Sequence, residues 1–242
     1  MTNNNPLKLP NRNPEVMKGV YKRFTQVFVQ LLILAGILFL ASGRLDWGMA
    51  WVYLFVYVAA ITMNAFLLIR KNPELIAERA EMKAGAKGWD KVLASLYVTT
   101  SSLVLLLVCG LDMRFGWSSQ IPAALELIAL VFGVLGFSFA NWAMMTNAFF
   151  SGLVRIQSER GHTVVSDGPY RFVRHPGYTG WTVFSIATPI MLGSWWALIV
   201  TGLATLLLVI RTALEDRTLR NELDGYKDYA ERVRYRLLPG VW

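Results

Sequence analysis

Long apolar runs separated by polar segments dominate the amino-acid sequence. Four of them contain no lysine, arginine or aspartate and suit membrane-spanning helices, which need roughly 20 residues: residues 24–41, 47–69, 92–111 and 121–146. Two shorter uncharged runs, 177–193 and 195–210, meet at Ser194 and Trp195. The pattern predicts an all-α integral membrane fold, a bundle of about six apolar helices. The last two form a tight hairpin of helices at or below spanning length.

Basic residues fall in alternate connections between these runs. Of the 24 lysines and arginines, 22 lie in four segments: 1–23, 70–91, 147–176 and 211–242. The connections 42–46 and 112–120 hold only Arg44 and Arg114. Loops rich in lysine and arginine stay on the cytoplasmic side of a membrane. We therefore expect both termini and the long loops to be cytoplasmic.

Composition narrows the class of protein further. Of the 242 residues 55% are hydrophobic and 17% charged, with a net charge of +8, whereas a soluble domain carries about 25% charged residues. Disordered, coiled-coil and collagen-like chains are excluded. Because topology accounts for most basic residues, we expect a lipid bilayer as partner and no nucleic acid. Cys109 is alone and there are two histidines, so we expect neither a disulfide within the chain nor a metal site.

The sequence divides into three parts. We expect residues 1–23 to form a cytoplasmic segment, and residues 24–146 to form transmembrane helices with a cytoplasmic loop at 70–91. Residues 147–242 would hold a cytoplasmic loop, the hairpin and a C-terminal helix that forms the cofactor-binding region. Near-helical spacing of leucine, tyrosine and valine predicts one helix over 211–236 that extends the last span.

The stretch from His162 to Gly180 holds the first candidate chemistry. Both histidines of the chain fall in it, together with Tyr170, Arg174 and Tyr178. Pro176 suits the first turn of a helix, and N–H groups at a helix start favour an anion such as a carboxylate. A loop whose arginines contact lipid phosphates is the alternative reading.

A second candidate cluster lies at the end of the last apolar run. Arg211 and Glu215 are four residues apart, so they share one helix face and could form an ion pair. Asp216 follows directly. Ionisable side chains at the end of a span can also simply reach toward the interface.

Together these residues resemble a known family. The ordered set is Gly168-Pro-Tyr-Arg-Phe-Val-Arg-His-Pro-Gly-Tyr-Thr-Gly180, then Arg211 and Glu215-Asp216 after the hairpin, then Tyr226 and Tyr229 before a proline. It is similar to the isoprenylcysteine carboxyl methyltransferase family, within the wider group that includes phospholipid N-methyltransferases. The resemblance covers about residues 150–240.

The resemblance implies an integral membrane enzyme that uses S-adenosylmethionine and takes its lipophilic acceptor from the bilayer. It places the cofactor contacts on Gln157, His162, Thr163, Val164, Val165, Tyr170, His175, Pro176, Gly177, Tyr178 and Glu215, with Arg174 or His175 available to the cofactor carboxylate. Arg211 corresponds to the residue that handles substrate. The spacing from Gln157 to His162 is shorter than in the family.

The acceptor determines the expected catalytic roles. A prenylated cysteine-type carboxylate, the favoured acceptor, needs no general base, and Arg211 could bind it bidentately. An amine acceptor, as in a phospholipid N-methyltransferase, would need Glu215 or Asp216 to take a proton. An NADPH-dependent sterol-type reductase and a non-catalytic scaffold or transporter are less favoured. For a transporter, Asn64 and Asn141 are the main polar groups within spans, and such groups more often link helices.

Overall fold

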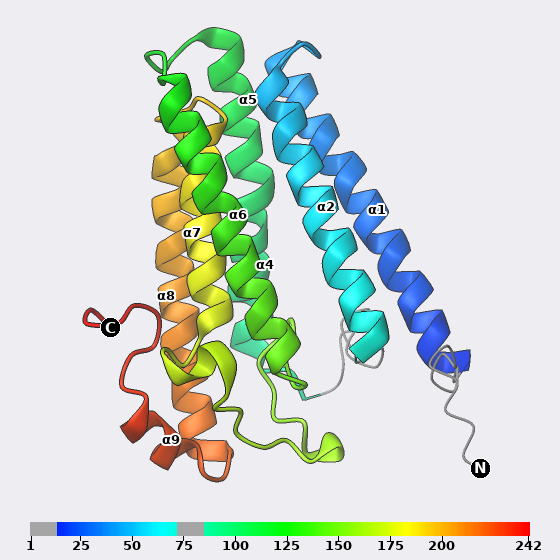
Figure 1. The fold of residues 1–242 in the computed structure, drawn as a ribbon, viewed down its shortest axis with the longest axis vertical. Helices are drawn as coiled ribbons and strands as arrows, with labels where there is room; N and C mark the ends of the chain where they lie inside the picture. The colour runs from blue at the N-terminus through cyan, green and yellow to red at the C-terminus, as the bar shows by residue number, and fades with distance from the viewer. Residues whose placement is uncertain (1–13, 72–84) are drawn as a thin grey trace, which may run out of the picture.

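The computed structural model describes residues 14–71 and 85–242, and within them every regular element is a helix. The predicted N-terminal segment up to residue 13 and the centre of the predicted 70–91 loop lie outside the described residues. The long elements are α1 (Pro14–Ser42), α2 (Gly48–Lys71), α4 (Gly88–Val98), the π-helical η1 (Thr99–Val104), α5 (Leu105–Phe115), α6 (Ala123–Thr146), α7 (Pro176–Met191) and α8 (Ala197–Glu222) (Figure 1). The short ones are η2 (Ser158–Arg160), η3 (Gly168–Arg171) and α9 (Tyr226–Arg232).

The long helices confirm the predicted multi-span membrane bundle. Within residues 14–71 and 85–242, five spans are long and apolar enough to cross a bilayer, and one of them, Gly88–Phe115, comprises α4, η1 and α5. Helix α7, which corresponds to the predicted apolar run 177–193, has 16 residues. It is therefore about 24 Å long, which is shorter than a hydrocarbon core of about 30 Å. It forms the predicted hairpin with α8 (Figure 1). The shortness of α7 matters for the site because it leaves space at one end of the bundle.

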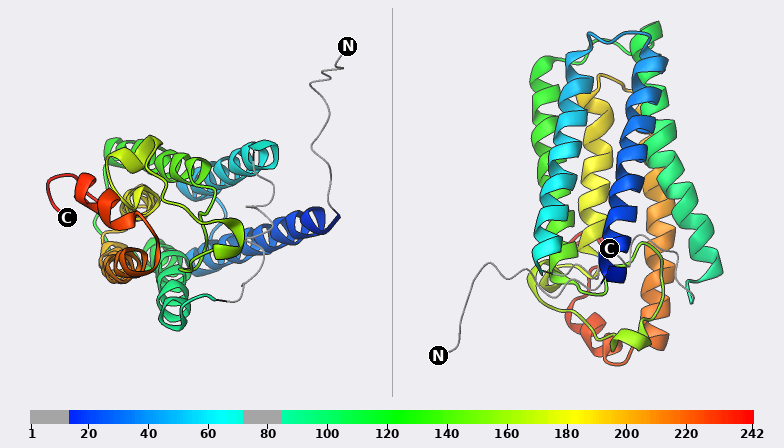
Figure 2. Two further views of the ribbon diagram at one scale, coloured as in Figure 1. Left: turned by 90° about the horizontal axis from the view of Figure 1, so that it is seen from below. Right: turned by 90° about the vertical axis from the view of Figure 1, so that its right-hand side faces the viewer.

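The connections alternate between the two ends of the bundle. Segment 147–175 and α9 lie at the lower end in Figure 1, and the connections 43–47, 116–122 and 192–196 lie at the upper end. After α9 the chain turns back along the bundle (Figures 1 and 2). The basic segments that the structure describes therefore share one end, which we continue to expect on the cytoplasmic side.

Helices α6 and α7 make the closest backbone contact in the bundle. A Cβ atom on Gly180 would lie 2.6 Å from the Ala140 nitrogen and even closer to the Gly136 carbonyl oxygen. Small residues allow membrane helices to approach in this way. Nearby, the Asn64 side chain of α2 donates a hydrogen bond of 2.8 Å to Asn141 of α6, which confirms the expected link between helices.

The prediction of one helix over 211–236 is wrong. Helix α8 does extend the last span, but it ends at Glu222, and α9 begins at Tyr226. Between them Gly225 adopts φ +77°, a left-handed conformation that glycine reaches without strain. The turn folds the aromatic residues of the tail onto the site, where a buried cluster forms from Ala143, Tyr170, Leu223, Tyr226, Tyr229 and Ala230.

The crossing of α6 and α7 predicts a specific sensitivity to added volume. We expect Gly180→Ala to lower the free energy of unfolding by about 1–3 kcal/mol, the usual cost of overpacking, as measured by thermal unfolding in detergent. Gly202→Ala on α8 is the matched control, because nothing lies within 4 Å of its Cβ position. Equal melting temperatures for the two variants would contradict this close contact.

Candidate active site

The start of α7 sits in a recess at the lower end of the bundle. Helix α8 continues seven residues beyond Glu215, the residue that faces the first turn of α7. Pro176 is the first residue of α7, as predicted, because its fixed φ suits a first helical turn. Segment 147–175 and α9 lie at the same end of the bundle (Figure 2).

A cavity lies within this recess, and we call it the loop cavity. Segment 147–175, the start of α7, the end of α8 and the tail all contribute to its wall. Ten residues that sequence reasoning assigned to the site line it: His162, Thr163, Val164, Val165, Tyr170, Arg174, His175, Gly177, Tyr178 and Glu215. Glu215 is the only acidic residue among the described residues of this wall.

A second, larger cavity of about 410 Å³ lies between the apolar helices, and we call it the membrane cavity. Its wall comes from α1, α2, α4, η1, α6 and α7, and Arg211 of α8 also lines it. Phe150, Ser151 and Tyr178 line both cavities. The two cavities therefore meet at these three residues.

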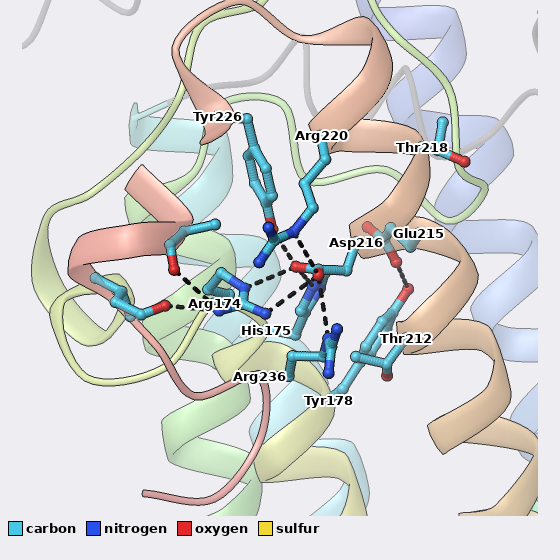
Figure 3. Close-up of polar contacts among 12 residues, drawn as sticks. Arg174, His175, Tyr178, Thr212, Glu215, Asp216, Thr218, Arg220, Tyr226 and Arg236 are labelled. Atoms are coloured by element: carbon cyan, nitrogen blue, oxygen red, sulfur yellow. Dashed lines mark hydrogen bonds and ion pairs between the residues drawn. The ribbon is translucent and has the colours of Figure 1, made fainter. Parts of the chain in front are cut away.

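Tyr178 contacts charged or aromatic side chains on both sides of the place where the two cavities meet. Its hydroxyl donates a hydrogen bond of 2.6 Å to the Glu215 carboxylate (Figure 3). Its ring stacks on His175, with centroids 5.8 Å apart and planes within 3°, and the Arg211 guanidinium carbon lies 5.3 Å from its centroid. One tyrosine thus separates the acid that lines the loop cavity from the arginine that lines the membrane cavity.

The expected ion pair between Arg211 and Glu215 is absent from the described structure. Arg211 instead forms a bidentate pair with Asp90 of α4, with Nε–Oδ1 2.6 Å and Nη2–Oδ2 3.0 Å. Its Nη2 also donates to the Gly152 carbonyl oxygen at 2.9 Å. Because Asp90 occupies the edge formed by Nε and Nη2, Arg211 cannot bind an acceptor carboxylate through that edge. Nη1 remains available to donate a hydrogen bond to an acceptor. Sequence reasoning missed Asp90, whose only signal was a carboxylate two residues before the apolar run 92–111.

Asp216 lies at the centre of a buried ion cluster outside both cavity walls. Its side chain is 1% exposed. It accepts hydrogen bonds from Arg174 (2.7 and 3.1 Å), Arg220 (3.2 Å), Arg236 (3.1 Å) and the Tyr226 hydroxyl (3.0 Å) (Figure 3). His175 Nε2 lies 3.5 Å from Oδ1. A carboxylate with these partners positions other groups and is not free to take a proton from a substrate.

Arg174 is also largely occupied by protein partners. Besides the pair with Asp216, its Nη1 donates to the carbonyl oxygens of Val233 (2.7 Å) and Arg234 (2.8 Å). The backbone N–H groups of Arg174 and His175 donate to Tyr235 and Arg236, each at 2.9 Å. Arg174 therefore fastens the tail to the start of α7, although it also lines the loop cavity.

Gln157 and His162 support the shape of the loop. Gln157 is fully buried and lies outside the cavity wall; its amide donates to the Phe149 carbonyl oxygen at 2.7 Å and accepts from Arg160 at 2.7 Å. His162 accepts a hydrogen bond from the Gln157 N–H (3.3 Å) and stacks on Phe149. Burial, aided by Arg155 and Arg160, lowers the pKa of His162, which favours the neutral ring that accepts this bond.

Tyr170 connects the loop to the tail and to α6. Its hydroxyl accepts a hydrogen bond of 3.2 Å from Asn147, and its carbonyl oxygen accepts one of 2.8 Å from Tyr229. Burial raises the pKa of Tyr170, so it stays a neutral phenol. Pro176, by contrast, begins α7 without lining either cavity.

The loop cavity offers groups that suit the expected cofactor, S-adenosylmethionine. Glu215 would balance the positive sulfonium and ammonium groups. The backbones of residues 163–165 make no hydrogen bond to any other described residue, so they are available to an adenine edge. At the start of α7, the Tyr178 and Thr179 N–H groups donate hydrogen bonds to the His175 carbonyl oxygen. The Gly177 N–H has no such partner among the described residues, so it is available to a carboxylate. The residues therefore fit the cofactor.

Fold and site together define a multi-span membrane protein in which a polar cavity at one end of the bundle adjoins a cavity between apolar helices. Residues 127–221 match the model of the isoprenylcysteine carboxyl methyltransferase family. The predicted resemblance to this family is therefore confirmed over these residues.

Curated relatives have consistent names. A probable protein-S-isoprenylcysteine O-methyltransferase of Oryza sativa subsp. indica is 29% identical over 122 residues, covering 43% of this chain and 64% of the relative. Protein-S-isoprenylcysteine O-methyltransferases of Dictyostelium discoideum (30% over 122 residues, 47% and 48%) and Homo sapiens (32% over 147 residues, 57% and 50%) are similar. The matches cover less than two thirds of each relative's length.

The Asp216 cluster predicts that this carboxylate is essential for a stable tail. Asp216→Asn removes the charge that faces three arginines, and we expect it to lower the free energy of unfolding by about 3–5 kcal/mol, as when one partner of a buried pair is lost. Limited proteolysis after α8 should become faster. Asp228→Asn on the exposed face of α9 is the control. Unchanged stability of Asp216→Asn would contradict the structural role given to this cluster.

Proposed function

We propose that the protein is an integral membrane methyltransferase that transfers a methyl group from S-adenosylmethionine to the carboxylate of a prenylated cysteine-type acceptor, with its active site on the cytoplasmic side. The observation that carries the proposal is the meeting of the two cavities at Phe150, Ser151 and Tyr178. A polar donor and an apolar acceptor could approach each other there from opposite sides. The names of the curated relatives support the same reaction and acceptor.

The loop cavity would hold the methyl donor. S-adenosylmethionine supplies an already activated methyl group on a positively charged sulfur. Glu215 would balance its positive charge, and the Tyr178 hydroxyl holds this carboxylate in place. The Gly177 N–H would bind the amino-acid carboxylate, because the first turn of a helix favours anions. A Cβ on Gly177 would lie 2.7 Å from the Phe150 ring, so glycine keeps that ring at the wall between the cavities.

The membrane cavity would hold the acceptor. Leu34, Ile61, Phe137 and Phe184 give it apolar walls from four helices, which suits a prenyl chain that enters from the bilayer. Arg211 lines this cavity beside Tyr178. Its Nη1 would hold one oxygen of the acceptor carboxylate and leave the other to face the donor. A carboxylate nucleophile carries no proton, so this reaction needs no general base.

Positioning and exclusion of water would supply most of the rate enhancement. Holding two reactants in line can be worth about 7–11 kcal/mol. Both sides of the site are fixed by buried charge pairs, Arg211 with Asp90 and Arg174 with Asp216. Neither pair needs to reorganise while the methyl group moves.

One observation favours a second candidate, N-methylation of a lipid amine. Glu215 is a half-buried acid directly beside the meeting point. It could take the proton that an amine nucleophile must lose. Asp216, the other acid considered from the sequence, is fully engaged with its arginines.

Transfer of labelled methyl groups tests the proposal. We expect the purified protein in lipid to transfer label from S-adenosylmethionine to an N-acetylated S-prenylcysteine and to give a base-labile methyl ester. A base-stable label in lipid amines would replace this function with N-methylation. Label in neither product, with no retention of the donor, would contradict a methyltransferase.

Two variants should separate donor from acceptor handling. We expect Arg211→Ala to lower kcat/KM for the acceptor by a factor that corresponds to a loss of about 2–4 kcal/mol of transition-state stabilisation, the range for loss of a charged partner. Donor affinity should be retained. Glu215→Ala should mainly weaken donor binding. Arg217→Ala, an exposed arginine on the same helix, is the control. Loss of donor binding in Arg211→Ala with normal acceptor handling would reverse the assigned roles.

A further inference from the structure

Asp90 is a buried carboxylate that belongs to neither cavity wall. It lies in the first turn of α4 and is 0% exposed. Its Oδ1 accepts from Arg211 Nε at 2.6 Å, and its Oδ2 accepts from Arg211 Nη2 at 3.0 Å and from the Val154 N–H at 2.7 Å. All three donors belong to groups at or beside the proposed active site.

The contacts of Asp90 fix the wall segment 151–154 as well as Arg211. The Val154 carbonyl oxygen accepts a hydrogen bond of 3.1 Å from the Lys87 N–H, so both backbone polar groups of Val154 bind the start of α4. Arg211 Nη2 donates to Gly152 two residues earlier. Ser151 lines both cavities. One carboxylate therefore holds α4, α8 and the wall between the cavities in a single arrangement.

The geometry of the guanidinium indicates what this arrangement achieves. Asp90 occupies the edge formed by Nε and Nη2, so the remaining nitrogen, Nη1, lies on the side of the guanidinium away from Asp90. Arg211 lines the membrane cavity and lies over Tyr178. A free arginine side chain has many rotamers, and fixing it before the substrate arrives removes that entropic cost from the reaction.

We propose that Asp90 is a positioning residue for methyl transfer, which holds Arg211 so that a single guanidinium nitrogen faces the acceptor at the meeting point of the cavities. The proposal rests on the proposed function. Asp90 does not line either cavity among the described residues, so it acts through Arg211 and does not touch the substrate.

Steady-state kinetics of Asp90→Asn provide the first test. The probe is an N-acetylated S-prenylcysteine with the full-length protein in lipid, and donor affinity is measured separately with S-adenosylhomocysteine. We expect acceptor kcat/KM to fall on the order of 100-fold, as for a misplacement of about 1 Å, while donor affinity changes less than about threefold, because Arg211, the side chain that Asp90 orients, lines the membrane cavity and not the loop cavity. An acceptor kcat/KM within threefold of wild type would overturn the proposal.

A double-mutant cycle distinguishes positioning from a purely structural role. If Asp90 acts through Arg211, its loss should cost little once Arg211 is changed. We expect Asp90→Asn with Arg211→Lys to have an acceptor kcat/KM within about threefold of Arg211→Lys alone, by the non-additivity of directly contacting residues. Multiplication of the two single effects would overturn the proposal.

Two further variants distinguish a loss of positioning from a loss of folding. Asp90→Glu keeps the charge but displaces Arg211 by one methylene, so it should fold, bind the donor and still lose acceptor kcat/KM by on the order of tenfold, as for a displaced supporting group. Wild-type acceptor kinetics in Asp90→Glu would overturn the proposal.

Glu222→Gln is the matched control. It breaks another ion pair between the start of α4 and α8, Lys87–Glu222 at 2.7 Å, and leaves Arg211 unchanged. Acceptor kcat/KM should stay within about twofold of wild type, as for an exposed pair. Absence of methyl transfer by the wild-type protein would instead refute the proposed function.

Discussion

One buried carboxylate, Asp216, determines how the end of the bundle is organised. A carboxylate that is 1% exposed cannot remain charged without partners, and here the partners come from three parts of the chain. Arg174 lies two residues before α7, Arg220 belongs to α8, and Arg236 belongs to the segment after α9. The tail must therefore fold back onto the start of α7, where Tyr226 and Tyr229 form part of the wall of the loop cavity.

Another buried carboxylate, Asp90, organises the membrane side in a similar way. Both carboxylates pair with an arginine through two hydrogen bonds. Tyr178 lies between the two pairs, stacked on His175 and near Arg211. Since protein partners satisfy these carboxylates, Glu215 is left as the acid that faces the loop cavity. The site thus separates charges that support its shape from the charge proposed to face the donor.

Most of the fold could be predicted from the sequence, because apolar run length and basic-residue placement are local signals. The break at Gly225 was missed, although Asp-Gly is a local turn signal, because near-helical spacing of apolar and aromatic residues continues through it as far as Tyr226 and Tyr229. Motif order identified ten of the residues that line the loop cavity. The roles of the candidate site residues were harder to predict. Arg211 pairs with Asp90, which is 121 positions away in the sequence, whereas helical spacing alone suggested Glu215 as its partner.

The central claim is that two cavities, one for a donor and one for an acceptor, meet at Tyr178. An experimental structure with S-adenosylhomocysteine and an S-prenylcysteine bound together tests it most directly. The account predicts the nucleoside beside Glu215 in the loop cavity, the prenyl chain in the membrane cavity, and the sulfur and carboxylate facing each other beside Tyr178. Both ligands in one cavity, or a donor bound away from Glu215, would contradict it.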